Sequence, residues 1–275
     1  MLMRLFLVVF CVFLMGVSFH SASAEPTPDP RQQMMQEATA LRTAHLISQL
    51  HLVPAATPSQ IASTRKIYED LIRRFPAEAE PHVVYGEFLV SVEKNEEAFQ
   101  HWENALKLDS KRHDVLAAEA ELLSRTGQIV AAADALEKAV ALAPANAEYA
   151  FALAHIYTLF RRDLMASRNQ TEDEILLRGT ACFQRAAELA PENLAYAQAY
   201  AETFYTQSKP DWKLALAAWE SLLERSPQKD FIRSHLVRVN IRLNDKLAAN
   251  RYLQELNNPD FASMRASLQR KIDQL

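Results

Sequence analysis

Glycine is scarce in this sequence: the 275 residues include four, whereas ordinary usage of ~7% would give about nineteen. Loops that bind phosphate groups, such as GxxxxGK and GxGxxG, need several glycines close together, and no such cluster occurs. The GxSxG motif of many serine hydrolases is missing as well. These absences exclude nucleotide binding through the glycine-rich motifs and a nucleophilic serine on a GxSxG turn.

Paired histidines and cysteine pairs are also lacking. None of the eight histidines has another histidine three or four residues away, which excludes a helical zinc site of the HExxH kind. We therefore expect no metal and no cofactor. Of the two cysteines, Cys11 lies in an N-terminal apolar run, so Cys182 has no intramolecular disulfide partner if that run is removed. We expect Cys182 to be a buried, inert thiol, with an intermolecular disulfide as the alternative.

The first 24 residues have the features of a secretory signal peptide. Arg4 precedes the apolar run Leu5–Val17, and Ala22 and Ala24 are the small residues that predict cleavage after Ala24. Residue 10, which precedes Cys11, is a phenylalanine, where a lipoprotein signal would have a small residue. An uncleaved anchor in the inner membrane is the alternative, although the run is shorter than the ~20 residues that span a bilayer. We expect a periplasmic or secreted protein that contacts a membrane only if the segment is retained.

The sequence has no excess of basic residues. Without residues 1–24 the chain has 29 basic and 34 acidic side chains, because only Arg4 is lost, and its formal charge is −5. Domains that bind nucleic acid usually have a basic surface. The composition therefore argues against a nucleic-acid partner.

Breaks between helical segments recur at a nearly constant interval. Pro76, Ser110 and Pro144 are each 34 residues apart, whereas Pro191 follows after 47 residues and Pro227 after a further 36. A period of 34 with two helices in each repeat is typical of tetratricopeptide repeats. Proline ends a helix because its ring removes a backbone hydrogen bond, so each break is expected to be a corner between repeats.

Small and large residues recur at fixed places within the repeats. Three small-residue positions are occupied, in chain order, by Gly86, Ala120, Ala154 and Ala201; by Ala98, Ala132, Gly179 and Ala215; and by Ala105, Ala139 and Ala186, with Leu222 in the last repeat. One large position holds Trp102, Leu136, Phe183 and Trp219. Gly127 falls at the turn between two helices, where a positive φ is easiest for glycine. This pattern predicts closely packed antiparallel helix pairs.

Over residues 58–257 the chain resembles the tetratricopeptide repeat family. The resemblance implies an all-α, right-handed α-solenoid of about five helix pairs, whose first helices line a concave groove that binds peptides or protein surfaces. We expect residues 25–30 to be a linker, 31–57 to be an N-terminal capping helix and 258–275 to be a C-terminal capping helix. In the last, Phe261, Met264, Leu268 and Ile272 share one face. Glu119 departs from the pattern, because the family favours a large apolar residue there.

The excess of 13 residues in the long interval corresponds to residues 161–173, between the two helices of one repeat. Thr171 and Glu174 form a T-x-x-E capping box, which predicts that the second helix restarts at about Glu172. The insertion is expected to be either a tolerated surface segment or a binding element.

Four positions of each first helix share a face, and the resemblance places that face in the groove. We call the sixteen residues the groove face: Glu80, Val83, Glu87, Val90, Asp114, Ala117, Glu121, Ser124, Glu148, Phe151, His155, Thr158, Ala195, Gln198, Glu202 and Tyr205. Six are acidic and none is Lys or Arg. The helix dipole accounts for acids in a first helical turn, such as Glu80, but not for those further along.

The expected partner-binding residues are Glu87, Glu121, Phe151, His155, Glu202 and Tyr205. Their charge favours a basic or amphipathic partner segment. The Lys and Asn side chains with which some family members bind a peptide carboxylate are missing, so binding of chaperone tails in that way is not expected. The sequence thus predicts a non-enzymatic interaction scaffold of the bacterial cell envelope. The alternative is an exported hydrolase that uses the groove carboxylates.

Overall fold

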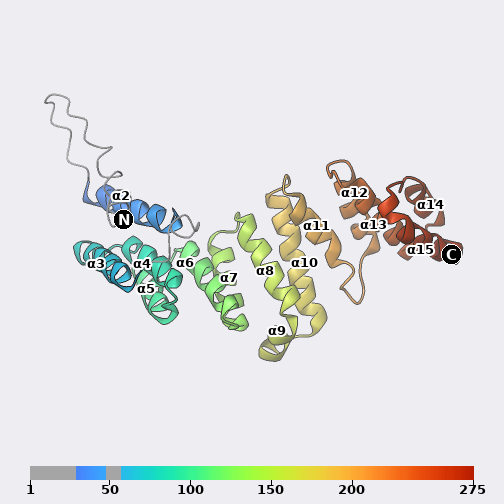
Figure 1. The fold of residues 1–275 in the computed structure, drawn as a ribbon. Helices are drawn as coiled ribbons and strands as arrows, with labels where there is room; N and C mark the ends of the chain where they lie inside the picture. The colour runs from blue at the N-terminus through green and yellow to red at the C-terminus, as the bar shows by residue number, and fades with distance from the viewer. Residues whose placement is uncertain (1–28, 48–56) are drawn as a thin grey trace, which may run out of the picture. The chain divides into compact units, whose positions relative to one another are not determined.

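The structure is a computed structural model that describes residues 29–47 and 57–275. Every regular element in these two ranges is a helix, and the chain divides into two compact units at Leu122–Leu123 (Figure 1). The predicted signal peptide, most of the predicted linker and residues 48–56 lie outside the described residues. Within the described part, no helix is both long enough and apolar enough to cross a membrane.

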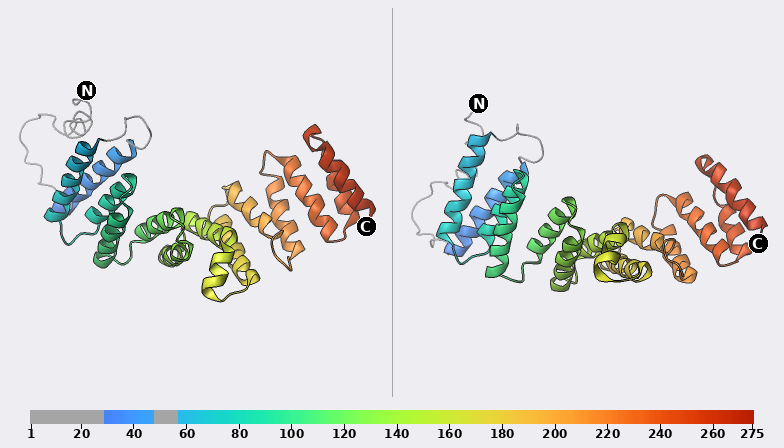
Figure 2. Two further views of the ribbon diagram at one scale, coloured as in Figure 1. Left: turned by 60° about the horizontal axis from the view of Figure 1, so that its bottom comes forward. Right: turned by 90° about the horizontal axis from the view of Figure 1, so that it is seen from below.

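The first unit contains α2 (Pro30–Ile47), α3 (Pro58–Arg74), α4 (Glu80–Ser91), α5 (Asn95–Leu108) and most of α6 (His113–Arg125). The views in Figure 2 place α2 beside α3 and α4. Met34 and Ala38 of α2 are buried against Tyr68 of α3 and Tyr85 of α4, whose rings are stacked with their centroids 5.1 Å apart. The N-terminal helix therefore contributes side chains to the core of this unit.

The second unit begins with the end of α6 and consists of helices that pack in succession. They are α7 (Ile129–Leu142), α8 (Ala147–Leu159), α9 (Arg161–Arg168), α10 (Glu172–Leu189), α11 (Leu194–Thr203), α12 (Trp212–Leu223), α13 (Lys229–Arg242), α14 (Lys246–Gln254), the 3₁₀ turn η2 (Pro259–Phe261) and α15 (Ala262–Asp273). Apart from the short α9, neighbouring helices along the chain pair with one another. The fold is an α-solenoid of helix pairs, as the repeat period predicted.

The corners between pairs lie at the predicted breaks. Helices α3, α7 and α10 end two residues before Pro76, Pro144 and Pro191, respectively. The next helix is then capped by a polar side chain where one is available: Asn146 accepts a hydrogen bond from the Tyr149 amide at the start of α8. Gly127, between α6 and α7, has a φ of +81°, which confirms the turn expected there.

The small positions are buried, as predicted. The alanines of all three series are between 0% and 1% exposed, and Leu222 is 1% exposed. Gly86 lies against the indole of Trp102, and a Cβ atom at Gly86 would be 2.3 Å from Trp102 Nε1. Only a residue without a side chain allows α4 and α5 to approach this closely.

The inserted segment is largely helical. Residues 161–168 form α9, and Asn169 ends it with a φ of +50°. Leu164 is fully buried, and Arg168 forms ion pairs with Asp134 and Glu137 of α7. The helix that follows starts at Glu172, and both hydrogen bonds of the predicted Thr171–Glu174 capping box are present. The insertion is therefore packed against α7 and α8, which precede it, and against α10, which follows it.

The C-terminal helix presents the predicted apolar face to the core of the second unit. Leu268 and Ile272 are buried, and Phe261 and Met264 pack against the same cluster while remaining partly exposed. This face covers α13 and α14, the last pair of helices in the unit.

Candidate functional site

The six predicted partner-binding residues divide between the two units. Glu87 and Glu121 belong to the first unit, on α4 and α6. The other four, Phe151, His155, Glu202 and Tyr205, belong to the second. The two sets therefore have to be considered separately.

In the first unit most groove-face acids are neutralised by arginines. Arg42 of α2 donates two hydrogen bonds to the Glu87 carboxylate, at 2.8 and 3.0 Å. Glu80 is only 8% exposed and lies between Arg42 at 3.0 Å and Arg112 at 2.8 Å. Arg112 also pairs with Asp114. Neither arginine is among the groove-face positions compared between repeats, because Arg42 is on α2 and Arg112 is at the corner before α6.

These pairs affect the ionisation of their members. The hydrogen bond with Glu87 is the largest of the effects that raise the pKa of Arg42, and burial opposes it. Burial alone would raise the pKa of Asp114, but the hydrogen bond and charge of Arg112 hold it below its ordinary value. Of the two predicted site residues in this unit, Glu121 is exposed and forms no ion pair among the described residues. Only Glu121 therefore matches the expected unpaired acid.

In the second unit, aromatic rings gather around Phe151 on α8. The Phe151 ring centroid is 4.3 Å from that of Tyr196 on α11 and 5.4 Å from that of Phe183 on α10. His155, one turn along α8, contacts Phe151 and Phe183 edge to face. Burial lowers the pKa of His155, so the imidazole is neutral at pH 7. Phe151, His155 and Tyr196 all remain partly exposed, so this aromatic surface is accessible.

A second aromatic group surrounds Tyr205, at the end of α11. The Tyr205 side chain is 38% exposed, and its hydroxyl is 3.0 Å from Nδ1 of His235 on α13. The His235 ring stacks on Trp219 of α12 with a centroid distance of 4.0 Å and an interplanar angle of 13°. Burial and the nearby Arg238 lower the pKa of His235 to about 4. The imidazole is therefore neutral and acts as part of an aromatic floor.

Exposed acids flank both aromatic groups. Glu148 precedes Phe151 by one turn of α8, and Glu202, in the last turn of α11, precedes Tyr205 by three residues. Glu202 accepts a hydrogen bond from Gln198 at 2.9 Å. Neither carboxylate pairs with an arginine or lysine in the described part of the chain. In this unit the structure thus brings together accessible rings and unneutralised acids.

The groove-face positions were compared between repeats only as far as α11, so Arg238 on α13 was not among them. The last interval between breaks is 36 residues, and the same step from Glu202 leads to Arg238. Arg238 is partly buried, with Nη2 3.5 Å from the Met264 sulfur, and Arg242 lies over the Trp212 ring at 5.7 Å. Extending the comparison by one interval would have shown that the sign of the charge changes at α13.

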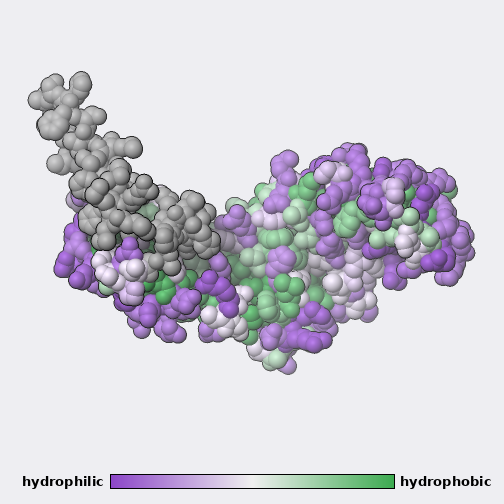
Figure 3. Space-filling model, viewed as in Figure 1, coloured by the Kyte–Doolittle hydropathy of each residue, from purple (hydrophilic) through white to green (hydrophobic). Residues whose placement is uncertain are grey.

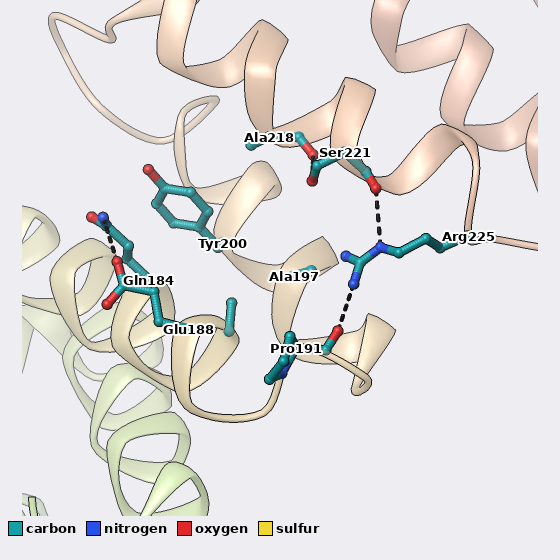
Figure 4. Close-up of a pocket in the computed structure, with 9 residues that line it drawn as sticks. Gln184, Glu188, Pro191, Ala197, Tyr200, Ala218, Ser221 and Arg225 are labelled. Carbon is teal, nitrogen blue, oxygen red and sulfur yellow. Dashed lines mark hydrogen bonds between the residues drawn. The ribbon is translucent and has the colours of Figure 1, made fainter. Parts of the chain in front are cut away.

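A separate pocket of about 220 Å³ lies between α10, α11 and α12. Its lining includes Gln184, Glu188, Tyr200 and Arg225 (Figure 4). The Arg225 guanidinium donates to the backbone carbonyls of Pro191, at 2.6 Å, and Ser221, at 3.1 Å. The bond to Pro191 anchors Arg225 to the corner that follows α10, so its role in the pocket is structural.

The described residues contain no group of three or more His, Cys, Asp or Glu side chains that could hold a metal ion.

On the face drawn in Figure 3, hydrophobic surface gathers over α7 and α8 of the second unit. In the first unit, three of the groove-face carboxylates that the hydrolase alternative would use, those of Glu80, Glu87 and Asp114, form ion pairs with Arg42 and Arg112.

No protein-family model matches the chain, and no curated protein resembles it significantly. Several proteins of known structure, however, have a fold similar to that of this chain. YrrB, described as a TPR protein with an unusual peptide-binding site, is 18% identical over 74% of this chain and 97% of its own, with a TM-score of 0.55. PilF of Pseudomonas aeruginosa is 13% identical over 86% of this chain and 99% of its own, with a TM-score of 0.51.

The C-terminal part of a TPR repeat-containing protein of Cytophaga hutchinsonii is 17% identical, and the match covers 81% of this chain and 85% of that one with a TM-score of 0.53. At these identities the likeness concerns the fold alone. The chain has a fold similar to that of tetratricopeptide-repeat proteins, as its 34-residue period predicted.

Proposed function

We propose that this protein is a non-enzymatic interaction scaffold that is exported to the bacterial cell envelope and binds a basic or amphipathic segment of a protein partner. The observation behind the proposal is the second unit, where accessible aromatic rings on α8 and α11 lie beside exposed acids that form no ion pair within the described part of the chain. Apolar contacts would supply affinity, and the acids would select for positive charge.

Two further observations support a binding role. YrrB, which has a similar fold, is described as having a peptide-binding site. In the first unit, an arginine from α2 already pairs with Glu80 and Glu87 of the groove face. That internal contact illustrates how a partner's arginine or lysine would pair with the equivalent acids of the second unit.

Export is proposed from the sequence features of residues 1–24. Cell fractionation followed by intact-mass measurement tests it directly. Export predicts a periplasmic or secreted species whose mass corresponds to cleavage after Ala24. A protein that stays in the membrane fraction at full mass would instead support the uncleaved anchor.

The binding surface is tested by capture from envelope extracts, with mass spectrometry of the retained proteins and affinity measurement for the partner so identified. Glu148→Gln combined with Glu202→Gln should weaken binding and reduce its dependence on salt, because two charges of the surface are removed. Glu192→Gln combined with Glu224→Gln is the matched control, since these acids are also exposed and belong to the same unit. Equal loss in both double variants would show that only net charge matters and would refute the proposed surface.

A further inference from the structure

Two arginines on α13, Arg238 and Arg242, form no ion pair among the described residues. Arg233, on the same helix, pairs with both Asp230 and Glu255. Arg238 is partly buried, whereas the other described arginines without an ion pair are exposed.

This arrangement is unfavourable for the helix alone. Like charges four residues apart on a helix repel one another. The helix dipole compensates Arg242, which lies in the last turn of α13, but Arg238 lies further inside. The polar contact of Arg238 is with the Met264 sulfur at 3.5 Å, and a thioether is a weak acceptor. The partly buried guanidinium thus has unused donors.

The two arginines border the aromatic floor already described. Tyr205 lies beside the neighbours of both arginines, because Arg242 lies over the Trp212 ring and Arg238 follows His235 by three residues on α13. Its ring lies 5.7 Å from Trp212 and 5.5 Å from His235. The exposed Tyr205 and the partly exposed Trp212 therefore have an acid on α11 and two cations on α13 near them.

We infer that the partner segment is bipolar: its basic part lies on α8 and α11 against Glu148 and Glu202, and an acidic part pairs with Arg238 and Arg242 on α13. The inference rests on the proposed function for the basic part and adds the acidic part. Guanidinium groups bind carboxylates in a bidentate geometry, and a neighbouring apolar surface reduces their hydration. The acidic groups are side-chain carboxylates within the segment.

The inference is tested with three fluorescent 12-residue peptides, amidated at the C-terminus so that only side chains contribute charge. Each has two blocks of four residues joined by Gly-Ser-Gly-Ser. The blocks are Lys and Glu in the first peptide, Lys and Gln in the second, and Gln and Gln in the third. Each peptide with two different blocks is made in both block orders. The affinity of each peptide for the full-length protein is measured by fluorescence anisotropy. Comparing the second peptide with the third tests the basic subsite, and comparing the first with the second tests the arginines.

We expect the Lys–Glu peptide to bind about three- to tenfold more tightly than the Lys–Gln peptide, corresponding to one or two partly exposed ion pairs. Arg238→Gln combined with Arg242→Gln should remove this difference, and Lys at both positions should largely restore it. Lys138→Gln combined with Arg162→Gln, which removes two exposed charges on α7 and α9, should leave it unchanged.

The outcomes separate the two claims. If wild type binds the Lys–Gln peptide more tightly than the Gln–Gln peptide but does not prefer the Lys–Glu peptide, the inference is wrong and the proposed function stands. If the Lys–Glu preference persists in the Arg→Gln variant while its thermal unfolding is unchanged, the inference is also wrong. If the Lys blocks give no gain but the Glu blocks do, the basic partner is wrong and the role of the arginines is supported.

Discussion

Replacing Gly86 by alanine adds one methyl group at the closest contact between α4 and α5. The added Cβ would be 2.3 Å from Trp102 Nε1 and 2.5 Å from Trp102 Cδ1, whereas ordinary contacts begin near 3.4 Å. The indole would have to move by about 1 Å, but it is 2% exposed and its N–H donates to the Val83 carbonyl at 3.3 Å. The ring cannot move without losing packing contacts, and its movement would weaken the hydrogen bond to Val83.

Two effects oppose each other in this variant. Alanine is a better helix former than glycine by about 1 kcal/mol. Overpacking of a tight core costs about 1–3 kcal/mol, and weakening of the buried hydrogen bond adds about 1 kcal/mol. We expect a net loss of about 1–3 kcal/mol, which corresponds to a lower melting temperature by roughly 2–4 °C per kcal/mol in a chain of this size.

Thermal unfolding followed by circular dichroism measures the effect. Gly179→Ala is a graded comparison, because its Cβ would meet the methyl group of Thr158 at 2.9 Å rather than a fixed indole, so a smaller loss is expected. If Gly86→Ala instead raised the melting temperature, the close packing of Trp102 against Gly86 would be refuted.

Three other outcomes follow from the structure. Burial lowers the pKa of His101 and of His235 to about 4, so below pH 6.5 the unfolded chain binds protons that the folded chain does not. Stability should therefore fall as the pH is lowered from about 6.5 to 4, and urea unfolding across this range with a His101→Gln variant checks it. Burial raises the pKa of the Cys182 thiol to about 11, so a maleimide should label native protein slowly at pH 7.5 and unfolded protein quickly. Thr171→Ala should cost about 1 kcal/mol because it removes the capping box of α10, and a melting temperature equal to that of wild type would argue against the cap.

The helix pairs could be predicted because close packing restricts residue size at particular positions. Gly86, Ala120, Ala154 and Ala201 recur where two helices touch, and any larger side chain would separate the backbones. These constraints are local and repeat with the fold, so one sequence reveals them. Corner prolines and capping residues such as Thr171 act within a few residues and are equally visible.

The insertion could not be predicted in the same way. Helix α9 is mostly polar, and Leu164 is its one fully buried side chain. The ion pairs of Arg168 with α7 connect residues 31 and 34 positions apart, at a spacing that no helical pattern encodes. A segment attached by one apolar contact and one arginine resembles an ordinary polar loop in the sequence.

The charge of the groove face was the least predictable property, because it depends on residues outside the repeat. Glu87 and Glu202 occupy equivalent positions of their repeats and look alike in the sequence. In the structure Arg42, 45 residues away, binds Glu87, while the side-chain hydrogen bond of Glu202 among the described residues is with Gln198. The register between α2 and α4 is not set by the 34-residue period, since residues 48–56 intervene.

This difference gives the same substitution two different outcomes. Glu87→Gln weakens a partly exposed ion pair with Arg42, so we expect a loss of up to about 1 kcal/mol in unfolding free energy. Glu202→Gln removes a charge that forms no ion pair in the described structure, and its exposed hydrogen bond with Gln198 contributes little, so stability should stay within about 0.5 kcal/mol of wild type while affinity for a Lys-containing peptide falls. Urea unfolding and peptide anisotropy on both variants measure the two effects. If Glu87→Gln left stability unchanged and lowered affinity as much as Glu202→Gln does, Glu87 would be free for a partner and its pairing with Arg42 would not persist in solution.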